Sequence, residues 1–464
     1  MEHRRLSALT TRQHGSASLL LLALAAAPVS AEDSARIEAL LQRIEALEAR
    51  LRALETERQP EPAGSGTLRE QLLTGTSGSA EAPAPEATAR DDAIAADERL
   101  AQAVLGSERE SKAPPPAPPP SVDVGGALRF NVVHRDFVDS SEGKYGESGL
   151  DVFRLNIDGE LDNILVSAEY RFYTYMDTIH HGWVGYQFED QSQLQVGIHQ
   201  VPFGLLPYAA HNAWFGVPYY LGLADDYDMG IRYQRQDGPW SSHLAFYKNE
   251  ELNSAGDLDR YSFDLVLDGD QQNEEIDQFN ARLAYTLGLG SGCETELGAS
   301  AQRSELYNSS SDRRGEHWAG ALHLDSRCGR WNLQLQGIRY DYDPANPPGL
   351  SRDAVRVGAF GGSYDIAGSA DVLVANIAYN FASPWSFIDQ VTCYNDYSRL
   401  FKDGDGQLDS QINTLGCAIG SGPLFTYVDY ILANNMAFFG NGSMAAGGED
   451  EWRGRFNVNI GFYW

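Results

Sequence analysis

The sequence predicts an all-β protein: a transmembrane antiparallel β-barrel of about 16 strands, preceded by a short periplasmic coiled coil and a linker. Apolar and polar residues alternate in one segment after another over about three hundred residues. No stretch is long and apolar enough for a membrane helix. A membrane protein without such helices must form a closed barrel, because only closure satisfies every backbone polar group in lipid.

The last ten residues, 455–464, show the alternation most clearly. One parity is apolar and comprises Phe456, Val458, Ile460, Phe462 and Trp464. The other carries polar residues such as Arg455, Asn457 and Asn459. A period of two is typical of a strand with one apolar and one polar face. In a membrane barrel the apolar face turns to lipid and the polar face to water.

Residues 1–31 are predicted to be a secretory signal peptide. Arg4, Arg5 and Arg12 precede the apolar run 19–27, and small residues lead to a cleavage position after Ala31. The alternative, a membrane anchor, is disfavoured because the run is well short of the ~20 residues that span a bilayer.

Residues 32–58 are predicted to form a coiled coil, because apolar residues recur at alternating spacings of three and four. These residues are Ile37, Leu40, Ile44, Leu47, Leu51 and Leu54. An amphipathic helix lying on another surface is the alternative interpretation. Residues 59–121 form a linker rich in Pro, Ala and Gly, with a polyproline stretch near its end. The barrel is expected over residues 122–464.

The chain is strongly acidic, with a formal net charge of −30, yet 11% of its residues are aromatic. The aromatic content argues against disorder, and the acidity argues against general nucleic-acid binding. From Ser121 onward, 22 Lys plus Arg face 47 Asp plus Glu, and the lysines are Lys144, Lys248 and Lys402. Acidity of this kind is mostly solvated loop charge.

Seventeen strands can be assigned from the alternation, including one implied by the tight turn at Asp237-Gly238. The others span 122–137, 152–160, 164–173, 183–188, 193–199, 229–234, 279–285, 293–306, 317–326, 331–341, 354–366, 371–380, 387–400, 411–419, 424–432 and 455–464. Since both ends of the barrel should lie in the periplasm, the number must be even. Strand directions clash between Tyr342 and Trp385, so one assignment there is in error. We expect 16 strands, with 18 as the alternative.

Four cysteines occur in this exported chain, where disulfides are permitted. Cys293 and Cys328 flank one predicted hairpin, and Cys393 and Cys417 are symmetric about a Gly-Asp turn. Pairing 293–328 and 393–417 is therefore the geometric prediction among three possible connectivities. The spacing fits no zinc pattern, so no metal or cofactor is expected.

The segment 200–228 is too apolar for an exposed loop and is broken by three prolines. We expect it to fold into the lumen and narrow the pore, because a wide barrel otherwise leaves an open channel. The alternative places it over a neighbouring subunit. The candidate constriction residues are Pro202, Phe203, Tyr208, His211, Trp214 and Tyr219.

Three segments, 196–204, 394–398 and 455–464, resemble the phosphate-selective porin O and P family of Gram-negative outer membranes. The resemblance covers about residues 122–464. It implies a sixteen-stranded trimeric porin with an inward-folded constriction loop, lying in the outer membrane among lipid and lipopolysaccharide. It also implies passage of small hydrophilic or anionic solutes.

The sequence departs from that family in its shortage of lysines, which accompany phosphate selectivity there. Arginines of lumen parity are present as candidate pore-lining residues: Arg129, Arg154, Arg171, Arg232, Arg282 and Arg356. A guanidinium binds phosphate or carboxylate with two hydrogen bonds, so they could line an anion path. The alternative, which we favour for most of them, is ion pairing with lumen acids such as Glu169 and Asp158.

Three weaker patterns resemble cation-binding or catalytic sites, and each has a simpler interpretation. The 403–409 segment resembles the start of a calcium loop but lacks the closing Glu, so a hairpin turn is expected. The acidic stretch 250–277 could bind divalent cations or bridge lipopolysaccharide, although solubility is the stronger explanation. His317 and His323 lack an evident catalytic partner, so no enzyme is expected.

The sequence therefore predicts a porin for passive diffusion of small hydrophilic solutes, including anions such as phosphate. The alternative is a structural anchor, in which the barrel holds a periplasmic coiled coil that contacts the cell wall.

Overall fold

The computed structural model describes residues 121–383, 385–448 and 450–464. The predicted signal peptide, the coiled coil and all of the linker except Ser121 lie outside these residues. In the described part, no helix is long and apolar enough to cross a membrane.

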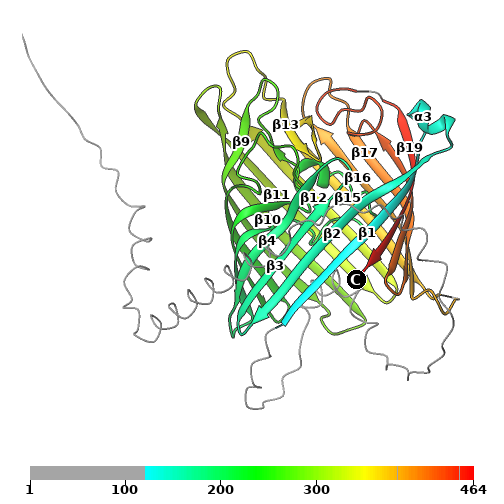
Figure 1. The fold of residues 1–464 in the computed structure, drawn as a ribbon. Helices are drawn as coiled ribbons and strands as arrows, with labels where there is room; N and C mark the ends of the chain where they lie inside the picture. The colour runs from blue at the N-terminus through cyan, green and yellow to red at the C-terminus, as the bar shows by residue number, and fades with distance from the viewer. Residues whose placement is uncertain (1–120, 384, 449) are drawn as a thin grey trace, which may run out of the picture. The chain divides into compact units, whose positions relative to one another are not determined.

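Sixteen antiparallel strands close into one barrel (Figure 1). They are β1 (Ser121–Arg135), β2 (Glu147–Leu161), β3 (Ile164–Phe172), β4 (Asp177–Gln187), β5 (Ser192–Gln200), β6 (Tyr227–Asp237), β7 (Trp240–Glu250), β9 (Asn273–Leu287), β10 (Cys293–Asn308), β11 (Arg313–Cys328), β12 (Trp331–Asp343), β15 (Ser369–Phe381), β16 (Gln390–Lys402), β17 (Ser410–Ser421), β18 (Leu424–Asn434) and β19 (Trp452–Tyr463). Each strand pairs with the next barrel strand along the chain, and β1 pairs with β19 to close the ring. The predicted number of strands is confirmed.

The strand assigned from the sequence to 354–366 was the wrong one. This stretch is a hairpin of β13 (Ala354–Ala359) and β14 (Gly362–Ala367), which forms a separate three-stranded sheet with β8 (Asp264–Leu265). Phe360 and Gly361 both have positive φ, at 54° and 72°. Two such residues in succession reverse the chain between two strands, so the run cannot continue across the membrane.

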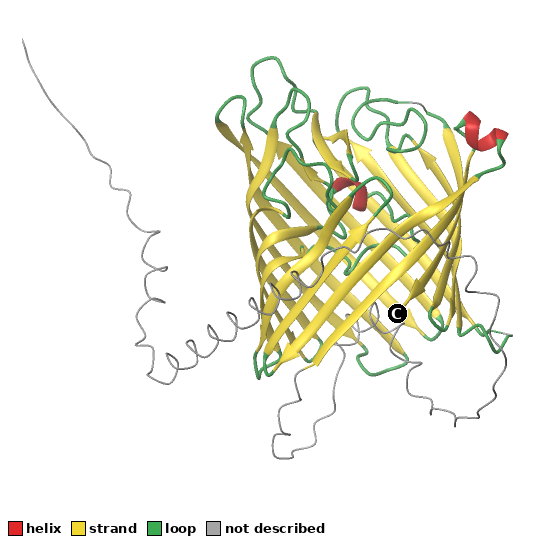
Figure 2. Cartoon of the chain, in the orientation of Figure 1, coloured by secondary structure: helices red, strands yellow, loops and turns green. Residues whose placement is uncertain are grey.

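The two ends of the barrel differ in the length of their connections (Figure 2). The turn end carries short connections and the C-terminus, as in the Asp162-Asn163 link between β2 and β3. The loop end carries 136–146 with the short helix α3 (Asp139–Gly143), 201–226 with the 3-10 turn η1 (Tyr219–Leu221), 251–272, 344–368 and 435–451. This asymmetry is the one expected of an outer-membrane barrel.

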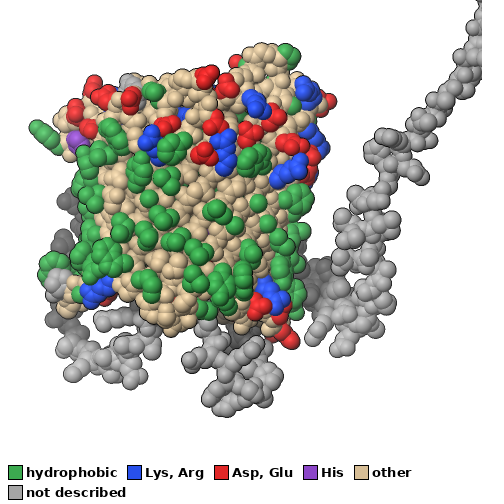
Figure 3. Space-filling view, turned by 180° about the vertical axis from the view of Figure 1, so that it is seen from behind, with side chains coloured by type: hydrophobic (Ala, Val, Ile, Leu, Met, Phe, Trp, Pro, Cys, Tyr) green, Lys and Arg blue, Asp and Glu red, His purple; other side chains and the backbone are tan. Residues whose placement is uncertain are grey.

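The outer surface of the barrel is apolar between two charged rims (Figure 3). Leu322 is 70% exposed and Leu244 60% exposed, although both lie within strands. Near the turn end, aromatic pairs such as Trp331 with Tyr379 form part of a girdle. The inward face is polar, with buried amides such as Gln302. Apolar residues therefore face outward, as lipid contact requires.

Both predicted disulfides are present, Cys293–Cys328 and Cys393–Cys417. Each joins residues that lie directly opposite one another on neighbouring strands, β10 with β11 and β16 with β17.

Inside the loop end, the long loops pack against one another around an apolar core. Val217, Val355, Ile366, Met436 and Met444 are fully buried in it. These residues come from three different loop segments, 201–226, 344–368 and 435–451. The loops are therefore one packed layer that extends into the lumen.

Candidate pore constriction

Residues 201–226, hereafter the constriction loop, leave β5, fold into the lumen and return to β6. The first part of the loop is fixed to the barrel wall by inward-facing side chains. Gly204 N donates to Ser300 Oγ on β10 at 3.0 Å, and Leu205 N donates to Gln336 Oε1 on β12 at 2.6 Å. Arg282 Nε on β9 donates to the Gly204 carbonyl at 2.8 Å. The expectation that this segment folds into the lumen is confirmed.

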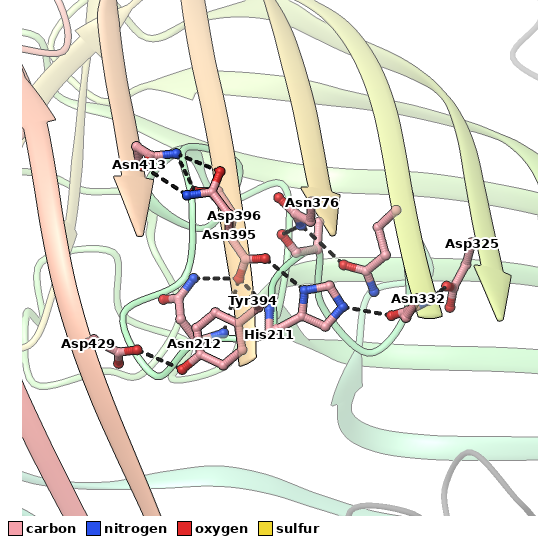
Figure 4. Close-up of polar contacts among 12 residues, drawn as sticks. His211, Asn212, Asp325, Asn332, Asn376, Tyr394, Asn395, Asp396, Asn413 and Asp429 are labelled. Carbon is pink, nitrogen blue, oxygen red and sulfur yellow. Dashed lines mark hydrogen bonds and ion pairs between the residues drawn. The ribbon is translucent and has the colours of Figure 1, made fainter. Parts of the chain in front are cut away.

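The middle of the loop is fixed to Asp396 on β16 (Figure 4). His211 Nδ1 lies 2.7 Å from Asp396 Oδ1, and the His211 amide donates to Oδ2 at 2.6 Å. Asn212 donates to the same Oδ2 from its amide at 3.1 Å and from Nδ2 at 2.8 Å. One buried carboxylate therefore accepts four hydrogen bonds from the loop, and charge-assisted bonds of this kind are the strong ones.

His211 lies between two acceptors. Its Nε2 is 2.6 Å from Asn332 Oδ1, and Asn332 Nδ2 donates to Asp325 and to the Ser326 carbonyl, which turns Oδ1 toward the ring. Burial disfavours the imidazolium, but the bonds to Asp396 and Asn332 outweigh it and raise the pKa of His211. Both ring nitrogens can then donate, as the two acceptors require.

A further contact fixes the loop just before η1, where Val217 N donates to Ser398 Oγ at 2.8 Å. Strand β16, which carries Ser398 and Asp396, is eight strands from β5 in the ring of sixteen. The loop therefore spans the full width of the barrel. The open side of the lumen is bounded by the strands on the other half of the ring, among them β19, β1, β2 and β3.

The six candidate constriction residues divide into two groups. Pro202, Phe203 and Tyr219 are buried within the loop layer, so they hold the loop and do not face water. Tyr208, His211 and Trp214 are partly exposed. The sequence pattern identified the loop correctly but did not separate its packed face from its open face.

On the open side, four arginines lie on four adjacent strands. These four residues, hereafter the arginine row, are Arg455 on β19, Arg129 on β1, Arg154 on β2 and Arg171 on β3. Arg154 lies directly opposite Arg171 in the register. Arg129 is two residues from Ala127, which lies opposite Arg154. Arg455 lies opposite Arg135, at the loop end of β1 and six residues along that strand from Arg129. The row therefore lies on four adjacent strands in the other half of the ring from the loop anchors, with Arg455 closest to the loop end.

Three arginines of the row are ion-paired. Arg129 is 2.7 Å from Asp151, Arg171 is 2.5 Å from Glu169, and Arg154 is 3.7 Å from Glu169. The expected pairing with Glu169 is confirmed. The expected ion pair of Asp158 with an arginine is not found among the described residues. Asp158 accepts a hydrogen bond from Ser167 Oγ at 2.6 Å.

Arg455 differs from the other three. Its guanidinium lies over the Trp214 ring, 3.8 Å from the ring centroid, and one nitrogen donates to Asn457 Oδ1 at 3.4 Å. Within the part of the chain that the structure describes, no carboxylate forms an ion pair with it. The row thus has an uncompensated positive charge at the constriction loop. Sequence reasoning did not select Arg455, although its shared parity with Asn457 and Asn459 marked it as lumenal.

The other three predicted pore-lining arginines, Arg232, Arg282 and Arg356, do not face the open side of the lumen. Arg232 is buried and donates to the Gln200 carbonyl and to Gln195, and Arg282 is buried beneath Gly204. The prediction for Arg356 was wrong: it lies on β13, outside the barrel wall, and pairs with Asp365 at 3.0 Å. Its misplacement follows from the mistaken strand at 354–366.

None of the three lysines of the barrel region supplies a positive charge at the constriction. Lys144 pairs with Glu147 at 3.1 Å, and Lys248 pairs with Asp277 at 2.6 Å. Lys402 donates to the carbonyl of Ser443 at 2.7 Å. Each lies at the loop end of its strand or in the adjoining loop, so arginine carries the positive charge at the constriction.

His317 and His323 have partners that the sequence did not indicate. His317 Nδ1 is 3.1 Å from Ser304 Oγ and 3.2 Å from Glu275, and His323 Nε2 is 3.1 Å from Glu296. Ser304 and Glu275 approach the same ring nitrogen of a fully buried histidine. A serine–histidine–acid relay needs the two groups on different nitrogens.

The 403–409 segment connects β16 and β17, in agreement with the expected turn. Asp403 pairs with Arg339 and accepts from Ser369 at 2.7 Å, while Asp409 pairs with Arg399 at 2.7 Å. These carboxylates are directed to different arginines and do not converge on one point.

No protein-family model and no curated protein matches the sequence. Solved structures that resemble the chain include OmpT, an outer membrane protein of Vibrio cholerae, at a TM-score of 0.48 and 12% identity over 74% of this chain and 98% of that chain. The anion-selective porin from Comamonas acidovorans has a TM-score of 0.46 and 13% identity, over 74% and 100%. The outer membrane channel DcaP of Acinetobacter baumannii has a TM-score of 0.46 and 12% identity, over 74% and 97%. Similarity this low does not transfer a function to this chain.

Proposed function

We propose that this protein is an outer-membrane porin through which small hydrophilic solutes diffuse passively, with a preference for anions. The observation that supports this most strongly is the constriction loop, which crosses the lumen from β5 to β16 opposite the arginine row. A channel selects by width and by the sign of the charge at its narrowest part. Such a mechanism needs no covalent chemistry.

The preference for anions rests on local charge. Although the chain is acidic overall, exposed charges farther away than about 8–10 Å are largely screened at physiological ionic strength. At the open face of the loop, the charge that lacks an ion-pair partner among the described residues is Arg455. Its guanidinium can donate to a passing carboxylate or phosphate. The paired arginines contribute less, because Asp151 compensates Arg129 and Glu169 compensates Arg154 and Arg171.

Phosphate is the first solute to test, because the sequence resembles the phosphate-selective porin O and P family. A single guanidinium binds an oxyanion through two parallel hydrogen bonds, so phosphate can be recognised without lysines. An arginine row in which most members are already paired with carboxylates favours a general preference for anions over a tight phosphate site.

We further propose a homotrimer in a bilayer of lipid and lipopolysaccharide. The apolar outer belt and the aromatic pairs near the turn end support the lipid contact. The same family resemblance supports the trimer. Cross-linking of the detergent-solubilised protein would test the oligomeric state.

Single-channel recording of the full chain in a planar bilayer, with phosphate added to a chloride electrolyte, tests the proposed function. We expect an open channel whose chloride current falls as phosphate competes for the arginine row. A conducting channel indifferent to phosphate would retain the porin and discard phosphate as a preferred solute. Absence of conductance from folded protein would overturn the porin assignment.

A further inference from the structure

Three carboxylates converge where the constriction loop returns to the barrel wall. Asp226 ends the loop, Asp228 is the second residue of β6, and Asp264 lies in β8 of the loop sheet. One oxygen from each lies within 4.8 Å of the others. The side chains belong to three elements, and all three residues are buried, at 5–8% exposure.

The surroundings add negative charge. Glu250, Glu251 and Glu275 lie next to the three aspartates and interact with them electrostatically. The positive group that faces this cluster is Arg260, 3.5–3.7 Å from Glu250, Glu251 and Asp264, and the His317 ring lies 3.2 Å from Glu275. The close hydrogen bonds of Arg260 go to the carbonyls of Asp257, at 2.8 Å, and Ser254, at 2.6 Å. One guanidinium and one histidine thus face six carboxylates.

Several oxygens of the cluster have no hydrogen-bond partner. They are Asp226 Oδ1, Asp228 Oδ1, Glu250 Oε1 and Glu251 Oε2, and their residues are 5–6% exposed. The two glutamate oxygens lie 3.7 Å from Arg260, whereas Asp226 and Asp228 have no ion-pair partner among the described residues. An unpaired buried carboxylate is among the most costly groups in a folded protein. A ligand that compensates this charge would remove the cost.

A cavity adjoins the cluster. Its volume is about 10 Å³, and Asp228, Glu250, Asp264 and Glu275 line it together with Tyr247 and Gln278. A space of this size is at the lower limit for one water molecule, so it suits a single small ion or water.

We propose that Asp226, Asp228 and Asp264 bind a calcium ion. The donors are all carboxylate oxygens, which hard divalent cations prefer. Ca²⁺ binds oxygen at about 2.3–2.6 Å, so ligands on opposite sides of the ion lie roughly 5 Å apart, whereas Mg²⁺ needs a tighter shell. Because the three oxygens all lie within 4.8 Å of one another, a single ion at the Ca²⁺–oxygen distance can contact all of them. Glu250 and Glu251 supply further oxygens nearby.

The ion would connect the end of the constriction loop to the loop sheet through Asp264. Hydrogen bonds already fix the beginning of the loop to Ser300 and Gln336 and its middle to Asp396. Calcium would then hold the returning part, in which Asp226 lies. This inference stands apart from the solute preference, since its test measures ion binding and not conductance.

The test is isothermal titration of CaCl₂ into the full chain, refolded in detergent free of lipopolysaccharide and treated with EDTA. We expect one saturable site with an affinity tighter than about 1 mM, as for extracellular calcium modules. The double variant Asp226→Asn and Asp264→Asn should weaken binding by at least about tenfold, because ligand charge sets calcium affinity. Asp270→Asn, an exposed position in the same loop as Asp264, is the matched control and should bind as the wild type does.

Two results would overturn the proposal. One is the absence of saturable heat from the wild type at millimolar CaCl₂. The other is unchanged binding in the double variant. If the double variant fails to refold, the wild type still decides the matter through its thermal midpoint, which should rise with CaCl₂ and return to its starting value with EDTA, as specific binding to the folded state requires. A midpoint indifferent to CaCl₂ would count against the site.

Discussion

His211 and Asp396 join the constriction loop to the far wall of the barrel, with Nδ1 and Oδ1 2.7 Å apart. The two residues are 185 positions apart in the sequence, and the loop and the strand that carry them meet only because the ring closes. A loop fixed at β5, β6 and β16 cannot swing out of the lumen without breaking this contact. The position of the middle of the loop therefore depends on one buried carboxylate and the groups that donate to it.

Replacing Asp396 with asparagine should loosen the loop. The variant loses the charge that four donors share, and hydrogen bonds to a charged group contribute about 1.5–3 kcal/mol each. We expect single-channel recordings to show a larger and noisier current than the wild type. Asp371→Asn, which removes a carboxylate that is 60% exposed, is the control and should leave the current unchanged. An Asp396→Asn channel as quiet as the wild type would contradict the anchoring role.

The anchor should also depend on pH. Because the folded protein raises the pKa of His211, the imidazolium stabilises the anchor fully below the ordinary histidine pKa. That stabilisation is lost as the pH rises through the raised pKa. Open-channel noise in the wild type should therefore increase as the pH rises above the ordinary histidine pKa and through the raised one. His211→Gln should abolish this transition, and a transition that persists in the variant would assign it to another group.

Trp214 should limit the size of the solutes that pass. Its ring lies beneath the Arg455 guanidinium at the open face of the loop, so Trp214→Ala removes bulk and leaves the wall intact. Liposome swelling with neutral sugars of increasing size should show a larger exclusion limit. Trp318→Ala, on the outward face of β11 and 45% exposed, is the control. Equal exclusion limits in the two variants would remove Trp214 from the constriction.

The Cys393–Cys417 disulfide should stabilise the barrel without affecting the pore. It closes a separation of 24 residues between neighbouring strands, for which the chain-entropy model gives about 3.5 kcal/mol. Replacing both cysteines with serine should lower the temperature at which the folded band disappears in SDS gels. Conductance should stay at the wild-type level, and a changed conductance would show that the bridge shapes the lumen.

The period-two pattern was sufficient to predict most of the architecture. It determined which face of each strand meets lipid. The number of strands had to be even because both ends of the barrel lie on the same side of the membrane. It failed at 354–366, where alternation also fits a hairpin outside the membrane, and the Phe360-Gly361 reversal is not evident from periodicity. Arg356 was misplaced for the same reason. Short alternating segments look alike whether or not they cross the bilayer.

The site itself was only partly predictable. The apolar, proline-broken segment identified the constriction loop, but its partners could not be named because they depend on the closed ring. In the sequence, nothing distinguishes Asp396 and Gln336 from the many other polar lumen residues, because only the folded structure brings the loop to them. The carboxylate cluster at Asp226 and Asp264 likewise joins segments 38 positions apart in the sequence. Contacts of this kind follow from tertiary structure, not from local pattern.

The most direct test of the central claim is the reversal potential of the wild-type channel in a KCl gradient across a planar bilayer. An anion-preferring constriction predicts a potential displaced toward the chloride equilibrium value, and Arg455→Gln should reduce this displacement. Arg303→Gln, which removes an outward arginine paired with Glu316, should leave it unchanged. A wild-type potential displaced toward the potassium equilibrium value would contradict the account, because the arginine row would then not control which ions pass.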